Sequence, residues 1–91
     1  MDISFAEWVN SHLKLYLEHT LNDLSFNRVE FEGKEYSIGD AIALIIDITD
    51  EYLSIKKDND IFIDTQAEEA LNDNLRFAGR LFVAIITYLW V

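Results

Sequence analysis

"GDAIALIIDITDEYLSIK", residues 39–56, is the stretch of sequence that decides the fold of this chain. Its apolar residues recur at steps of three and four, which predicts an α-helix with one buried side. That side is wide, because the polar interruptions are few and mostly acidic. A helix with a wide apolar side needs several neighbours, so we expect it to be the central element of the fold. Its main polar positions are Asp40, Asp47, Asp50, Glu51 and Ser54.

A helix start is predicted where a Ser or Thr is followed three residues later by an acidic residue, because each side chain can bond the other's backbone amide. The pattern occurs at Ser4–Glu7, Ser37–Asp40 and Thr65–Glu68, each time before a run of periodic apolar residues. The chain of 91 residues has no proline and three glycines, which favours long uninterrupted helices. The predicted helices span residues 5–24, 39–56 and 66–90.

A short β-hairpin is predicted in the sequence "VEFEGKEYSI", between the first two helices. Val29 and Phe31 alternate with a charged residue, and Tyr36 and Ile38 alternate with a serine. Pairing Phe31 with Tyr36 across Glu-Gly-Lys-Glu puts the four apolar side chains on one face, with Gly33 supplying the turn.

The sequence "DIFID", residues 60–64, is compatible with either a third strand or an extended loop. No linker or internal repeat divides the chain, so residues 1–91 are expected to form a single compact domain. The fold class that follows is mainly α, a small α+β domain of three helices with a β-hairpin between the first two.

The last stretch, "RLFVAIITYLWV", residues 80–91, carries no charge after Arg80. It is too short to cross a membrane, which takes about 20 apolar residues. Either the helix end is covered within the chain, or part of it is left for self-association in a homodimer. We expect Leu81, Phe82, Ile85, Tyr88 and Leu89 to face the core, and Val83, Ile86, Trp90 and Val91 to remain for a second chain.

The formal net charge of −10 disfavours direct binding to nucleic acid or to an anionic membrane, since both require Lys and Arg. It is compatible with a basic protein partner. Ten carboxylates lie between Asp40 and Asp73, against Lys56 and Lys57. We expect them to form an acidic partner-binding surface, although a charged face that merely keeps the protein soluble is the alternative. The candidate residues are Asp40, Asp47, Asp50, Glu51, Asp58, Asp60, Asp64, Glu68, Glu69 and Asp73.

No catalytic or cofactor-binding pattern is found, so we expect a protein that is not an enzyme and that needs no cofactor or metal. The absence of cysteine excludes thiol chemistry and thiolate metal sites. Residues 58–69 have part of the acidic spacing of a calcium loop, but Phe62 and Ile63 stand where a ligand and a glycine are needed. His12 and His19 are two helical turns apart, so we expect His12 to be a partly buried, hydrogen-bonded residue.

The sequence therefore favours a small acidic inhibitor that binds a basic, nucleic-acid-handling protein by carboxylate mimicry of nucleic acid. This profile is typical of anti-defence proteins of phages and mobile elements, such as anti-CRISPR or antirestriction proteins. Two alternatives stay open: an immunity protein or antitoxin that neutralises a basic toxin, and a dimer-forming structural subunit that uses its apolar C-terminal helix. The start "MDISFAEW" has no basic region typical of a signal peptide, so the expected location is the cytoplasm of a bacterial host cell.

Overall fold

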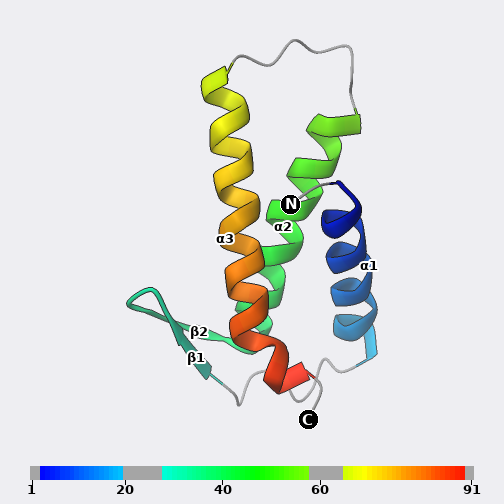
Figure 1. The fold of residues 1–91 in the computed structure, drawn as a ribbon. Helices are drawn as coiled ribbons and strands as arrows, with labels where there is room; N and C mark the ends of the chain where they lie inside the picture. Colours follow the sequence, from blue (N-terminus) through cyan, green and yellow to red (C-terminus); the bar gives the residue numbers. More distant parts are fainter. Residues whose placement is uncertain (1–2, 20–27, 58–64, 90–91) are drawn as a thin grey trace.

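The computed structural model describes residues 3–19, 28–57 and 65–89 of the chain. They form three helices and a two-stranded antiparallel hairpin placed between the first two helices (Figure 1). This arrangement confirms the predicted fold class, a small and mainly helical α+β fold. The elements are α1 (Ile3–His19), β1 (Arg28–Phe31), β2 (Lys34–Ser37), α2 (Ile38–Lys57) and α3 (Thr65–Leu89).

The start of α1 differs from the prediction. The helix begins at Ile3, so Ser4 lies inside its first turn and is not the cap. Ile3 packs against a cluster of buried residues to which Tyr52 and Leu71 belong, and this apolar contact favours the additional helical residues. Residues 20–24, which were predicted as the end of this helix, lie outside the described residues.

The other two helices agree with the prediction to within one residue at each described end. At the start of α2, the backbone N–H of Asp40 donates to the Ser37 Oγ at 3.1 Å. Ser37 is therefore the N-cap of the central helix, as its spacing to Asp40 predicts. The possible strand at residues 60–64 and most of the calcium-like sequence lie outside the described ranges.

The hairpin is present, but its predicted register is wrong. Val29 pairs with Tyr36, and Phe31 pairs with Lys34, so the loop has two residues and not four. Its residues, Glu32 and Gly33, both have positive φ, at 50° and 78°. A two-residue turn with positive φ at both residues matches the right-handed twist of the strands. The error is a slip of two residues, which leaves the apolar side chains on the same face.

The helix α2 is the centre of the fold, as predicted. It packs against both α1 and α3, and its core residues Ile42 and Ile45 are completely buried. In Figure 1, α2 runs between the other two helices and in the opposite direction along the chain. The hairpin packs on α3, where the rings of Phe31 and Phe77 meet edge to face at 5.6 Å. No helix in the described part of the chain is long and apolar enough to span a membrane.

Candidate protein-binding surface

The exposed side of α2 carries four carboxylates, more than the exposed side of either other helix in the described part of the chain. The helix is covered on both flanks, so its exposed residues fall within an arc of about 100° around the helix axis. Four of the six are acidic and none is basic. We call these six residues the α2 acidic face: Asp40, Ala43, Asp47, Asp50, Glu51 and Ser54.

Three of these carboxylates, those of Asp40, Asp47 and Glu51, form no ion pair with any cation of the described residues. Repeated turns of one rigid helix hold them, at steps of seven and four residues. Their negative charge is therefore available to a partner without breaking an existing contact.

Asp50 is different, because its carboxylate contacts α1. The Lys14 Nζ donates to the Asp50 Oδ1 at 2.9 Å, and the Asn10 Nδ2 donates to the same oxygen at 2.9 Å. The hydrogen bond from Lys14 is the main reason that the pKa of Asp50 lies below its usual value of 3.8, and the Asn10 amide adds to this effect. Partial burial opposes both. Asp50 thus fixes α1 against α2 and contributes less free charge to the surface.

A buried polar contact between α1 and α2 lies directly behind Asp50. The Asn10 Nδ2 donates to the Thr49 Oγ1 at 2.8 Å, and the Thr49 hydroxyl donates to the Ile45 carbonyl at 2.9 Å. Both side chains are buried, and no buried polar side-chain atom of the described residues lacks a partner. This pair was not predicted from the sequence. The sequence feature that indicates it is Asn10, a polar residue that follows Val9 on the buried side of α1.

The remaining predicted acidic residues do not extend the α2 acidic face into one ridge. Glu68 pairs with Lys56 at 3.3 Å, and Asp73 pairs with Arg76 at 3.1 Å. Glu69 is exposed on the side of α3 opposite its buried residues. The structure therefore brings together the acidic residues of α2 and separates those of α3 from them. The other predicted residues, Asp58, Asp60 and Asp64, lie outside the described ranges.

The apolar end of α3 is largely buried within the chain. Leu81 and Ile85 are completely buried, and Phe82 nearly so, as predicted. Val83 is 67% exposed, which fits its predicted place outside the core. Ile86 was also predicted to lie outside the core, but it is half-buried against the main core cluster, on the inner side of the last turns of α3. The side chains of Tyr88 and Leu89, and the residues Trp90 and Val91, lie outside what the structure describes.

His12 is exposed, and the prediction that it is partly buried is wrong. Its Nδ1–H donates to the Trp8 carbonyl at 2.8 Å, and its ring stacks on the Trp8 ring at 4.2 Å. The ring lies over the outer surface of α1 and not against the core, because it follows Trp8 by one turn and Trp8 is itself 46% exposed.

Comparisons of the chain with protein-family models, with curated proteins and with solved structures gave no match. The candidate site is therefore defined by the residues and geometry of this chain alone.

Proposed function

We propose that this protein is a non-enzymatic inhibitor whose α2 acidic face binds a basic, nucleic-acid-handling protein at the surface where that protein holds nucleic acid. The observation that carries the proposal is the row of Asp40, Asp47 and Glu51, exposed on one helix face and unpaired among the described residues. Such a face attracts a cationic surface over long range and speeds its encounter.

The charge density of the face is comparable to that of a DNA strand. From Asp40 to Glu51 the helix rises by about 17 Å, and in that length one DNA strand carries about five phosphates. The α2 acidic face has four carboxylates in the same length, of which Asp50 is neutralised by Lys14. The three carboxylates without an ion pair stand against about five phosphates of a DNA strand, so the face could occupy part of a phosphate-binding groove but not all of it.

The scaffold favours tight binding because little has to be ordered on association. The helix α2 is packed on both sides and joined to α1 through the Asn10–Thr49 hydrogen bond. Carboxylates on such a helix are held in place before the partner arrives, which lowers the entropic cost of binding.

The test is capture from a bacterial lysate followed by binding measurements with the purified partner. We expect the wild-type protein to bind a nucleic-acid-binding protein, with an affinity that falls steeply between low and moderate salt and that duplex DNA competes away. The double variant Asp47→Lys, Glu51→Lys should weaken this binding by at least about 100-fold, and mainly by slowing association.

The matched control changes the net charge by the same amount at other exposed sites. The double variant Glu30→Lys, Glu69→Lys alters β1 and the outer side of α3, away from the α2 acidic face. It should weaken binding by less than about tenfold, through the smaller net charge alone. Equal losses in the two double variants would contradict a role for the α2 acidic face. A partner that DNA does not compete away would contradict nucleic-acid mimicry.

A further inference from the structure

The Asp50 carboxylate is contacted by two donors from α1, an amide and an ammonium group. The Asn10 Nδ2 and the Lys14 Nζ both donate to the Asp50 Oδ1, each at 2.9 Å. The other oxygen, Oδ2, accepts no hydrogen bond from the described residues. The side chains of Asp50 and Lys14 are each 51% exposed. One oxygen of this carboxylate is therefore open to a further donor.

Of the two donors, the amide is fixed and the ammonium group is not. Asn10 is buried, and its Nδ2 also donates to the Thr49 Oγ1 at 2.8 Å, inside the contact between α1 and α2. Lys14 contacts Asp50 through one hydrogen bond, from the end of a flexible four-carbon side chain. An ion pair of this exposure is weak. Asp50 would therefore keep its position and orientation if Lys14 moved away.

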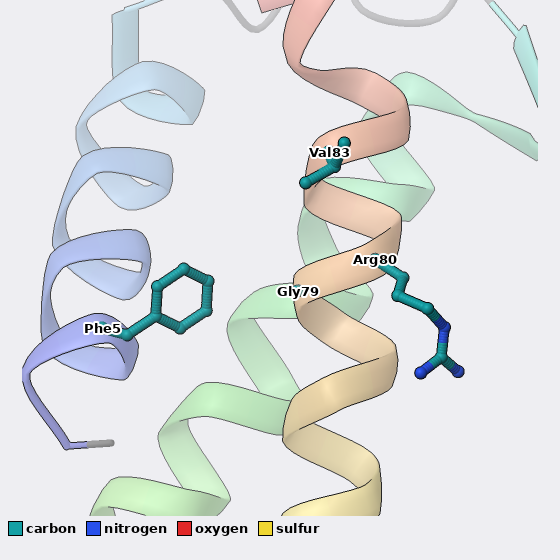
Figure 2. A pocket seen from close by; sticks show the side chains of 4 residues that line it. All are labelled: Phe5, Gly79, Arg80 and Val83. Atoms are coloured by element: carbon teal, nitrogen blue, oxygen red, sulfur yellow. The ribbon is translucent and has the colours of Figure 1, made fainter. Parts of the chain in front are cut away.

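Every other Lys or Arg side chain that the structure describes has its contact elsewhere in the molecule. Lys34 lies over the Tyr36 ring, 5.3 Å from the ring centroid. Arg80 lines the pocket shown in Figure 2, where its side chain extends from α3 away from α1. If Lys14 left Asp50, the α2 acidic face would therefore have four free carboxylates and not three. The other four cations form these ion pairs: Arg28 with Glu35, Lys56 with Glu68, Arg76 with Asp73, and Arg80 with Glu32.

We propose that Lys14 occupies the place of an arginine of the basic partner, and that the partner displaces Lys14 when it binds the α2 acidic face. This inference rests on the proposed function. A guanidinium group fits the site better than the ammonium group does, because its planar fork can donate to Oδ1 and Oδ2 together. Oδ1 keeps the hydrogen bond from Asn10 on its second lone pair. The displaced ammonium group returns to water.

The ion pair between Lys14 and Asp50 thus acts as an internal competitor that selects the partner. An isolated cation gains little at Asp50, because it only replaces one ion pair by another. An arginine of a protein that also contacts Asp47 and Glu51 is held beside Asp50 at a high effective concentration, so it displaces Lys14 readily. The face therefore favours a partner that presents several cations on one surface.

NMR of the full chain, titrated with an octaarginine peptide, tests the displacement directly. At saturation we expect the Lys14 ζ-ammonium signal to move to the position of a lysine without an ion pair. The Asn10 side-chain amide signals should change little, because that amide keeps its contact with Thr49. An octalysine peptide of the same charge should displace Lys14 only at higher concentration. A Lys14 signal that stays in place at saturation, or equal displacement by the two peptides, overturns the proposal.

Variants of Lys14 test the competition, measured as the affinity for fluorescent octaarginine. Lys14→Gln should tighten binding by about threefold, the change expected when a half-exposed ion pair no longer competes. The matched control is Arg76→Gln, which removes the same charge and frees Asp73 on α3, and it should tighten binding by less than about 1.5-fold. Lys14→Arg keeps the competing cation and should bind no more tightly than the wild type. Equal gains in Lys14→Gln and Arg76→Gln overturn the proposal.

The double variant Asp47→Lys, Glu51→Lys separates this inference from the proposed function. If it binds octaarginine as tightly as the wild type does, the α2 acidic face is not the binding surface, and both proposals are wrong. If it binds about tenfold more weakly while Lys14→Gln gains nothing over its control, the proposed function stands and the displacement of Lys14 is wrong.

Discussion

Asp47 and Asp50 stand on the same exposed face of α2, one turn apart, and the structure gives them opposite roles. Asp50 accepts hydrogen bonds from Lys14 and Asn10, whereas Asp47 has no ion pair among the described residues. We therefore expect Asp50→Ala to lower the free energy of unfolding and Asp47→Ala to leave it unchanged or slightly raised.

The magnitude follows from the two contacts that Asp50 loses. The ion pair with Lys14 joins two side chains that are each 51% exposed, so it contributes about 0.2–1 kcal/mol after screening by water. The hydrogen bond from Asn10 contributes about 0.5–1.5 kcal/mol. Both variants gain the same helix propensity from alanine, about 0.5 kcal/mol. The difference between the two variants should therefore be about 1–2 kcal/mol, independent of that gain.

Urea unfolding followed by circular dichroism measures this difference, provided that the slope of the transition is the same for both variants. The effect should also depend on pH. The pKa of Asp50 is lowered in the folded protein, so its contribution is complete above the usual value of 3.8 and is lost as the pH falls through the folded pKa. In strong acid the Asp50 carboxylate is protonated and this contribution is absent, so Asp50→Ala and the wild type should then have similar free energies of unfolding.

Two results would refute this reasoning. If the two alanine variants unfold at the same urea concentration at neutral pH, the contacts of Asp50 with α1 add no stability. If Asp47→Ala is the less stable variant, Asp47 has a partner that the described residues do not include. In either case the separation of the α2 acidic face into one structural and three free carboxylates would be wrong.

Two further predictions concern the elements that hold this face in place. Asn10→Leu and Thr49→Val should each lower the free energy of unfolding by about 1–3 kcal/mol, because each removes a hydrogen-bond partner from a buried polar side chain. In a double-mutant cycle measured by urea unfolding, the double variant should lose about 1 kcal/mol less than the sum of the two single losses, whereas additive losses would show that the two side chains are not coupled. Gly33→Ala should lower the free energy of unfolding, measured by thermal unfolding, by about 1 kcal/mol through the positive φ alone, since no atom lies within 4 Å of the added methyl group. Gly33→Asn should lower it by less, and equal losses would point to a cause other than backbone strain.

The helices could be predicted from sequence because their information is local. The apolar steps of three and four and the capping spacing at Ser37 fix the position of α2 to within one residue. The hairpin register could not be predicted in the same way, since a slip of two residues keeps the same apolar face. The register depends on whether Glu32 adopts a positive φ, which is uncommon for a residue other than glycine.

The site was harder to predict, because it depends on which helix sides are covered. The sequence indicated the acidic residues of α2, but it could not show that Lys14 of α1 reaches only one of them. No role was predicted for Asn10 from the sequence, although its side chain forms a hydrogen bond between α1 and α2. Trp8 was assigned to the buried stripe of α1 and is instead 46% exposed, since its ring meets the third helix only at its edge, through Phe82 at 6.0 Å. Such facts arise from the packing of helices distant in sequence.

The two charged helix faces of the protein differ in the balance of their charges. The exposed side of α3 belongs to the same protein and carries three carboxylates, but also the two guanidinium groups of Arg76 and Arg80. Charges of both signs, interspersed on one face, are typical of an ordinary solvent-exposed helix surface. The α2 acidic face has four carboxylates and no cation of its own, which raises the repulsion within a single helix face. A cationic partner of the kind proposed above would offset that repulsion on binding. Neutralising Asp47 and Glu51 together should therefore raise the free energy of unfolding measured in urea, because it removes the like-charge repulsion between two carboxylates four residues apart on α2.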